Sequence, residues 1–217
     1  MPSTLPLFPL NVVLFPGMAL PLHIFEPRYR AMVNACVAAS QPFGVVLIKD
    51  GPEVGGPAEP HPIGTAAQIT DVKRLPDGRL NIEAVGYERF RILALHHDEA
   101  YLTGTVEPYP MAGTDGALAR RAARALAPWL LRYLDLLGEA AATKFEPSVL
   151  PNNPESLAYL AAIVAQVPMS EKQGLLADGD AVALLQRERI MLRREVSLLR
   201  AMLANPRSHD TTPFSPN

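Results

Sequence analysis

Apolar residues dominate the start of the chain. Residues 5–30 read LPLFPLNVVLFPGMALPLHIFEPRYR, and the first charged residue is Glu26. A segment this apolar must be buried on both faces, so we expect the rest of the domain to pack around it. The dipeptide Pro16-Gly17 marks a turn between two strands, the second over Met18–Phe25. Pro27 begins a helix, where its missing N–H costs no hydrogen bond.

Further along, the hydrophobic pattern has mostly the two-residue period of β-strands. Residues 27–40 are the exception, because apolar residues there recur at helical spacing and predict a helix. The expected strands cover residues 43–49, 65–75, 80–95 and 101–107. The strand over 80–95 either continues through Gly86 or bends there. Pro76-Asp77-Gly78 predicts a hairpin turn, and the proline- and glycine-rich residues 50–62 predict a long loop.

The pattern becomes helical after PYPMAGTDG at residues 108–116. We therefore expect a β-rich part over 1–110, a helical part over 111–205 and a flexible tail over 206–217. The expected helices cover residues 115–142, 154–166, 170–178 and 180–203, with a loop at 145–153. Pro128 should kink or split the first helix. The last helix carries one apolar stripe, formed by Leu185, Leu192, Val196, Leu199 and Leu203.

Composition points to a protein of the cytoplasm. The 217 residues carry a net charge of −2 and one cysteine, Cys36. A chain of this length can bury a core without disulfides, and one cysteine cannot form a disulfide within the chain. The amino-terminal stretch contains many prolines and lacks basic leading residues, which argues against a signal peptide. No apolar run of about 20 residues is free of proline and charge, so we expect no membrane span.

The opening stretch resembles the amino-terminal, substrate-binding domain of the Lon protease family. It is most similar to stand-alone bacterial proteins that carry only this domain. The resemblance continues through FGVVLI at 43–48, DGR at 77–79 and GYERFRI at 86–92, and more loosely over 154–203. It implies an α+β fold, with a PUA-like β pseudo-barrel and an inserted helix followed by a C-terminal helical bundle. Eight residues of these motifs are expected to have structural roles: Pro16, Gly17, Glu26, Arg28, Arg30, Gly86, Arg89 and Phe90.

The resemblance does not extend to the enzymatic activities of Lon. A phosphate-binding loop needs the pattern Gly-x4-Gly-Lys-Ser/Thr, which the chain lacks. The Ser–Lys dyad of Lon belongs to a domain beyond the matching region. Cys36 lies among apolar residues of a predicted helix, where a structural thiol is expected rather than a nucleophile. We therefore expect a non-enzymatic protein without a cofactor.

Metal and nucleic-acid binding are also not expected. His23, His61 and the run His96–Glu99 contain possible ligands, but we interpret them as polar loop residues or partners of nearby arginines. Eight arginines make the helical part locally basic, which we interpret as a solvated helix face: Arg120, Arg121, Arg124, Arg187, Arg189, Arg193, Arg194 and Arg200. Residues 1–110 hold 8 Lys/Arg against 11 Asp/Glu, which argues against nucleic acid.

Binding of unfolded or partner polypeptides is the function that the resemblance implies. Such binding needs exposed apolar surface or an open strand edge. The candidate contact residues are Phe15, Met18, Phe25, Tyr109 and Met111. The resulting hypothesis is a polypeptide-binding module that acts as an adaptor or holdase in protein quality control. A small-molecule sensor and an uncharacterised hydrolase are alternatives, and the oligomeric state stays open.

Overall fold

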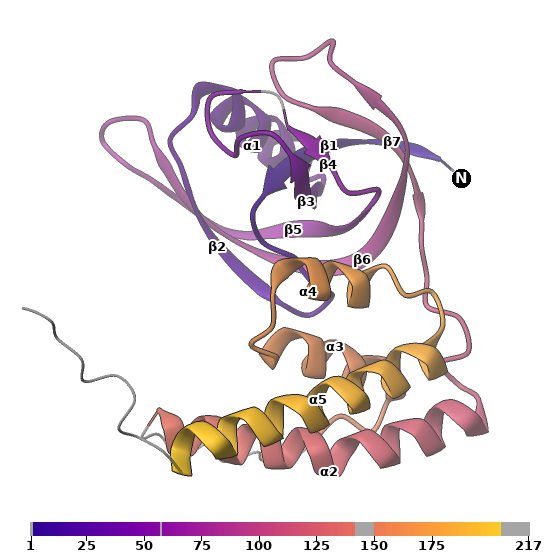
Figure 1. Cartoon of the computed structure of the whole chain (residues 1–217). Coiled ribbons are helices and arrows are strands. Elements are labelled where there is room, and N and C mark those ends of the chain that lie inside the picture. The colour runs from indigo at the N-terminus through magenta and orange to yellow at the C-terminus, as the bar shows by residue number, and fades with distance from the viewer. Residues whose placement is uncertain (1, 57, 142–149, 205–217) are drawn as a thin grey trace, which may run out of the picture. The chain divides into compact units, whose positions relative to one another are not determined.

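The chain forms a mixed α/β fold in the computed structural model, which describes residues 2–56, 58–141 and 150–204 (Figure 1). A seven-stranded, largely antiparallel sheet and, among these residues, five helices make up the fold. The elements are β1 (Ser3–Leu10), β2 (Ala19–Ile24), α1 (Pro27–Ala39), β3 (Phe43–Asp50), β4 (Glu59–Pro60), β5 (Ile63–Arg74), β6 (Leu80–His96), β7 (Thr103–Pro108), α2 (Ala117–Ala140), α3 (Pro154–Val164), α4 (Met169–Leu176) and α5 (Ala181–Ala204). The expected tail over 206–217 and most of the loop over 145–153 lie outside the described residues.

The chain divides into two compact units. The sheet unit contains Met1–Ala112 and Ala162–Asp180, and the helical unit contains Gly113–Ala161 and Ala181–Asn217. The expected division into 1–110 and 111–205 therefore needs a correction, because residues 162–180 pack with the strands. Gln173 of α4 explains this packing, since its buried amide donates a 2.9 Å hydrogen bond to the carbonyl oxygen of Ile63 in β5.

The strands pair in the order β1-β7-β6-β5-β3-β4, and β2 pairs with β6. Because β1 also pairs with β3, in parallel, the series of pairings returns to its first strand. β6 continues past Gly86, where its register against β5 shifts by a bulge, so one long strand is present rather than two. A Cβ atom on Gly86 would lie 2.6 Å from the carbonyl oxygen of Phe15, which leaves room for glycine only.

The main core of the sheet unit lies between α1 and the strands around it. Met32, Val33 and Cys36 of α1 are fully buried with apolar side chains of β1, β2, β3 and β6. The ring of Tyr29, near the start of α1, stacks on the ring of Phe8 in β1, with 4.0 Å between the ring centroids. The helix predicted from Pro27 is thus present. Of the apolar residues at helical spacing, Met32, Val33 and Cys36 are buried, whereas Val37 is exposed.

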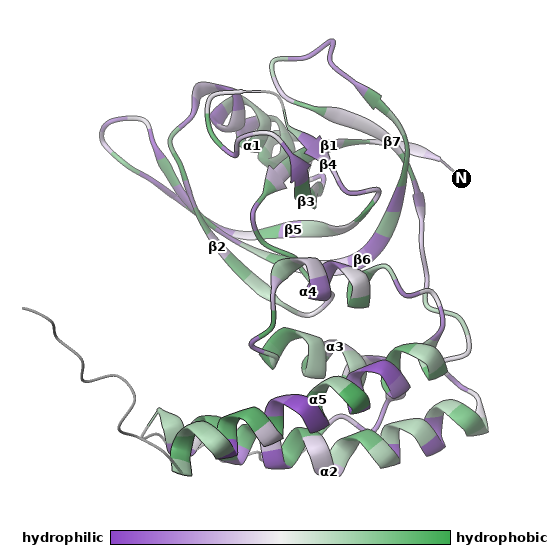
Figure 2. Cartoon of the chain, in the orientation of Figure 1, coloured by the Kyte–Doolittle hydropathy of each residue, from purple (hydrophilic) through white to green (hydrophobic). Residues whose placement is uncertain are grey.

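The helical unit is built around the pair α2 and α5, whose apolar stripes are buried. Figure 2 shows hydrophobic and hydrophilic residues alternating along α5, as expected for a partly exposed helix. α2 is not split at Pro128, because it is continuous from Ala117 to Ala140. Asn153 precedes α3 and caps it, because its side-chain oxygen accepts hydrogen bonds from the N–H groups of Glu155 and Ser156.

No helix in the described part of the chain combines the length and apolar character that a membrane span requires.

Candidate functional site

An apolar pocket of about 210 Å³ opens where β2 leads into α1. We call it the Phe25 pocket. Its lining residues are Phe8, Leu10, Leu22, His23, Ile24, Phe25, Glu26, Tyr29, Glu53 and Val54. Phe25 lies in the short connection between the two elements, where neither strand alternation nor helix packing directs it into the core. Its side chain is 49% exposed, and that of Val54 is 55% exposed. Two large, exposed apolar side chains therefore line one pocket, which makes it a candidate binding surface.

The wall opposite Phe25 is formed by the loop that follows β3, and hydrogen bonds hold this wall in place. The side-chain N–H of Asn11 donates a 2.7 Å hydrogen bond to the carboxylate of Glu53. Arg28 joins the same loop to α1, because it pairs with Glu26 at 3.0 Å and donates to the carbonyl oxygen of Gly56 at 3.1 Å. The pocket is therefore formed before any ligand binds, which lowers the entropy that binding must overcome.

The floor of the Phe25 pocket is part of the core. Phe8 and Tyr29 form it with their stacked rings, and both are almost completely buried. Burial is the main cause that raises the pKa of the Tyr29 hydroxyl, so this group stays neutral at ordinary pH. A ligand side chain that reaches the floor would meet aromatic surface.

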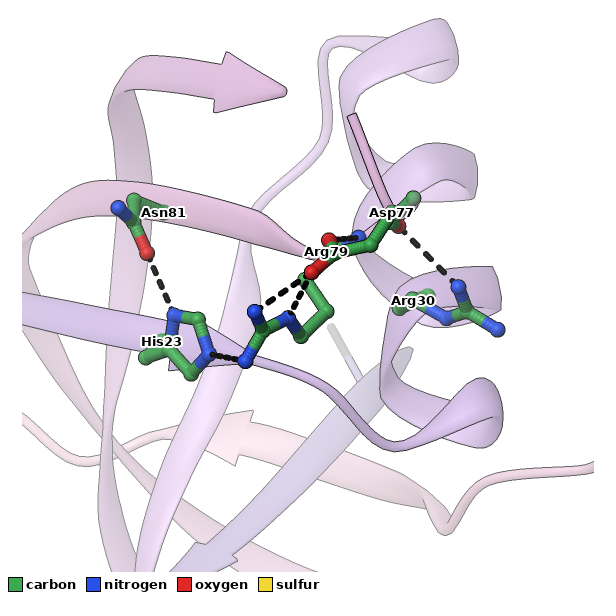
Figure 3. A network of polar contacts seen from close by, with 6 residues as sticks. His23, Arg30, Asp77, Arg79 and Asn81 are labelled. Atoms are coloured by element: carbon green, nitrogen blue, oxygen red, sulfur yellow. Dashed lines mark hydrogen bonds and ion pairs between the residues drawn. The ribbon is translucent and has the colours of Figure 1, made fainter. Parts of the chain in front are cut away.

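A polar network borders the pocket on the side of the β5–β6 turn (Figure 3). The Nδ1 atom of His23 lies 2.6 Å from Oδ1 of Asn81, and its Nε2 atom lies 3.3 Å from a guanidinium nitrogen of Arg79. Arg79 in turn pairs with Asp77. The Oδ1 atom of Asn81 can only accept a hydrogen bond, so the Nδ1–H group of His23 donates to it. The network fixes the His23 ring, which stacks near Phe25 with 6.2 Å between the centroids.

One edge of β2 is open beside the pocket. β2 pairs with β6 along its whole length, and no other strand in the described part of the chain pairs with it. Leu22, His23 and Ile24, the last three residues of β2, all line the pocket, so the pocket adjoins the end of this strand. Pro21 lacks an N–H group and is typical of an edge strand. An extended polypeptide could add to this edge and place a side chain in the pocket.

The five residues expected to contact polypeptide differ in their exposure. Phe25 is exposed at the mouth of the pocket. Phe15 and Met111 need a correction, since they are 1% and 7% exposed and belong to the core. Met18 is half-buried against that core. Tyr109 is half-buried, and its hydroxyl donates a hydrogen bond to the carbonyl oxygen of Ala177. Sequence reasoning missed these burials because an apolar residue near a turn has the same pattern whether it points in or out.

The residues expected to have structural roles form two groups. Those at the start of the chain shape the turn and α1: Gly17 has a φ of +82°, Glu26 pairs with Arg28, and Arg30 donates to the carbonyl oxygen of Gly78. Pro16 precedes that glycine in the turn, whose hydrogen bond joins the N–H of Met18 to the carbonyl oxygen of Phe15.

Arg89 and Phe90 of β6 have different structural roles. Phe90 is buried in a second apolar cluster with β1 and β7, and Gly44 and Gly64 leave space for its ring. Arg89 is 2% exposed and donates hydrogen bonds of 2.7 and 2.6 Å to the carbonyl oxygens of Leu176 and Asp178. These carbonyls lie at the C-terminal end of α4, where a cation also interacts favourably with the helix dipole.

Sequence reasoning missed Glu53 and Val54. It predicted the loop over residues 50–62 but singled out no residue in it. Val54 is the one large apolar residue in DGPEVGGPAEPHP, and that was the available signal. The contact between Asn11 and Glu53 joins residues far apart in the chain, so no local pattern indicated it.

The possible nucleophile and the possible metal ligands of the described residues can be compared with what catalysis and metal binding require. Burial raises the pKa of the Cys36 thiol, which is 1% exposed, and a buried neutral thiol is a poor nucleophile. Among the described residues, no three His, Cys, Asp or Glu side chains lie close enough together to hold a metal ion. His96 contacts the hydroxyl of Thr105.

The chain is similar to known proteins of one family. Residues 4–194 match the family model described as the ATP-dependent protease La (LON) substrate-binding domain. The chain is 28% identical over 204 residues to a Lon protease of Anaeromyxobacter dehalogenans, and equally so to Lon protease 2 of Myxococcus xanthus. Each match covers 92% of this chain and 24% of the relative. The chain thus spans about a quarter of the length of these curated relatives.

Two solved structures share the fold. The Lon N-terminal domain protein from Xanthomonas campestris is 26% identical, with a TM-score of 0.58, over 85% of this chain and 96% of the other. The N-terminal domain of the Mycobacterium avium complex Lon protease is 20% identical, with a TM-score of 0.67, over 90% and 98%. Both support the arrangement of strands and helices described above.

Proposed function

The chain belongs to the family of the LON substrate-binding domain, and from this premise we propose that it is a non-enzymatic module that binds unfolded or partner polypeptides at the Phe25 pocket. The observation that carries the proposal is the pocket itself, with its exposed apolar mouth beside an open strand edge. In protein quality control, such a module would act as an adaptor or a holdase.

Recognition would combine two contributions. An extended segment adds to the edge of β2, so that its main chain supplies hydrogen bonds that do not depend on sequence. One large apolar side chain of the segment enters the pocket and covers Phe25 and Val54. Burying an apolar side chain completely contributes about 1.5–3 kcal/mol. A single site of this kind gives weak, rapidly reversible binding, as suits a protein that must release its substrates.

The charges at the pocket favour some segments over others. Glu26 and Glu53 both line it, and Arg28 compensates only the first directly. A segment with acidic residues beside its apolar side chain would bring like charges together, which costs affinity. We therefore propose that the preferred segments carry lysine or arginine, or no charge, next to the apolar residue.

The alternatives have less support. A drug-sized ligand occupies a pocket of about 300–1,000 Å³, whereas this pocket holds about 210 Å³ and is open at its mouth. A hydrolase would need an activated nucleophile, and Cys36 is buried with a raised pKa. We also propose, on the family resemblance, that the returning series of strand pairs is a PUA-like pseudo-barrel, that the helical unit is the C-terminal bundle, and that the protein acts in the cytoplasm without nucleic acid or membrane partners.

Fluorescence anisotropy tests the proposal. The probe is a labelled, permanently unfolded polypeptide rich in phenylalanine and lysine, titrated with the protein in the absence of ATP. A stable rise supports binding, and Phe25→Ser should weaken it roughly tenfold. Tyr87→Ser is the matched control, because Tyr87 is an aromatic residue of the same unit with 50% exposure and does not line the pocket. A slow fall below the starting value would mean cleavage and would contradict the proposal, as would equal losses in both variants.

A further inference from the structure

The helical unit carries a second surface feature, a groove between α2 and α5. It has a volume of about 300 Å³. α2 contributes Leu118, Arg121 and Ala125 to its lining, and α5 contributes Val182, Leu185 and Arg189. A groove along two helices has the shape that an additional helix fits.

The lining of the groove combines apolar side chains with two arginines. Among the described residues that line it, Arg121 and Arg189 are the only charged ones, and none is a carboxylate that would neutralise them. Glu188, next in sequence to Arg189, is completely buried and does not line the groove. The local charge of the groove is therefore positive, although the chain as a whole carries a net charge of −2.

Arg189 lines the groove, and its Nε atom is buried without a hydrogen-bond partner among the described residues. A buried donor without an acceptor is costly. An ionised carboxylate is a strong acceptor for a guanidinium group, so a ligand that carries one in the groove would complement the charge of Arg189.

Exposed apolar side chains extend the surface beyond the groove. Leu118 lines it and is 68% exposed, one of the most exposed large apolar residues of the described chain. Ile190 is 65% exposed and lies one helical turn after Gln186, which also lines the groove. Apolar residues flanking a basic groove are typical of a protein-binding surface rather than of a solvated helix face.

We propose that this groove binds an acidic amphipathic helix of a partner protein. An apolar side chain of that helix enters between α2 and α5 and covers Leu118. Aspartate or glutamate residues one turn before and after it, at i±3 or i±4, lie on the same face of the helix and pair with Arg121 and Arg189. This surface is separate from the Phe25 pocket, so the inference does not depend on the function proposed above.

Designed peptides test the inference on the full chain. The probe is a fluorescein-labelled helical peptide with leucines at i and i+4 and glutamates on the same face, and the comparison peptide has lysine at every glutamate. We expect the acidic peptide to bind and the basic one to bind at least about tenfold more weakly, with affinity for the acidic peptide falling as salt is added. In the amide NMR spectrum of the protein, Leu118, Ala125 and Val182 should shift.

Variants on α2 separate a specific site from general charge. Arg121→Glu should weaken binding of the acidic peptide roughly tenfold, whereas Arg132→Glu, an exposed arginine of the same helix outside the groove, should leave it within about twofold. Leu118→Ser should weaken it as well, and both positions are exposed, so neither change should disturb folding. Equal binding of acidic and basic peptides would overturn the inference. So would tight binding of a single-stranded RNA at Arg121 without binding of the peptide, or self-association through this groove instead.

Discussion

The side-chain amide of Asn11 and the carboxylate of Glu53 lie 2.7 Å apart, in a hydrogen bond that spans 42 positions of the chain. The backbone N–H of Asn11 points to the same carboxylate at 3.4 Å. The contact fastens the loop after β3 to the end of β1. Because that loop carries Val54, Asn11 determines the position of one wall of the Phe25 pocket without lining the pocket itself.

Replacing Asn11 should therefore affect binding more than stability. In Asn11→Ala the loop wall loses its side-chain hydrogen bond, and we expect affinity for the unfolded polypeptide to fall about threefold to tenfold. The bond is exposed, so the free energy of unfolding should change by less than about 1 kcal/mol. Anisotropy titration and urea unfolding measure the two effects. Asn34→Ala is the matched control, because it removes an exposed hydrogen bond to Arg74 far along the chain. An equally large loss of affinity in Asn34→Ala would contradict the role of Asn11 in positioning the loop wall of the Phe25 pocket.

Arg89 should be the arginine of β6 that matters most for stability. Arg89→Met leaves the carbonyl oxygens of Leu176 and Asp178 without their donor in a buried site, which should cost about 2–4 kcal/mol. Arg91→Met is the control, since Arg91 also lies over the Tyr109 ring but pairs with Glu107 at the surface and should cost at most about 1 kcal/mol. Hydrogen exchange should show the loss first in the amides of α4. Unchanged exchange there would contradict the proposed attachment.

Gly86 should tolerate no side chain. In Gly86→Ala the new Cβ atom would lie 2.6 Å from the backbone carbonyl oxygen of Phe15, so the turn before β2 must shift. We expect a loss of about 2 kcal/mol in the free energy of unfolding, in the range seen for overpacked cores. Gly116→Ala has only an ordinary 3.6 Å contact and serves as the control. Thermal unfolding of both variants measures the loss of stability in each. Equal stability of the two variants would show that the turn accommodates the methyl group.

Cys36 should make stability depend on alkaline pH. Burial raises the pKa of its thiol in the folded state, whereas the thiol of the unfolded chain titrates at about 8.5. The unfolded state therefore loses its proton first. The stabilising difference is fully present below the unfolded pKa and is lost as pH rises through the folded pKa. Urea unfolding between neutral and alkaline pH should show a steeper decline for the wild type than for Cys36→Ala. Parallel declines would mean that the thiol ionises equally in both states.

The sequence predicted those parts of the fold that depend on local patterns. The turn at Pro16-Gly17, the helix from Pro27 and the helix from Pro154 follow from backbone preferences that act within a few residues. The attachment of residues 162–180 to the strands was not predictable. It depends on Gln173 and Arg89, two polar side chains whose partners are backbone carbonyls more than 80 residues away.

The same distinction, between features set by local patterns and features set by distant contacts, applies to the candidate site. The sequence named Phe25 as a candidate contact but placed it at the end of the strand over residues 18–25, whereas it follows β2 in the connection to α1. Phe15, named on the same grounds, is 1% exposed. Its backbone carbonyl lies close to Gly86 of β6, a contact between distant parts of the chain that no local pattern indicates. Glu53 and Val54 could be assigned to the site only through the contact with Asn11.

The central claim, that the Phe25 pocket receives an apolar side chain of an unfolded polypeptide, is tested most directly by methyl NMR of the full protein titrated with the unlabelled phenylalanine- and lysine-rich polypeptide. We predict that the methyl signals of Leu22, Ile24 and Val54 shift together. In Phe25→Ser the same shifts should need roughly tenfold more polypeptide, whereas Tyr87→Ser should titrate as the wild type does. Binding that leaves these three signals unchanged while methyl groups elsewhere shift would contradict the claim.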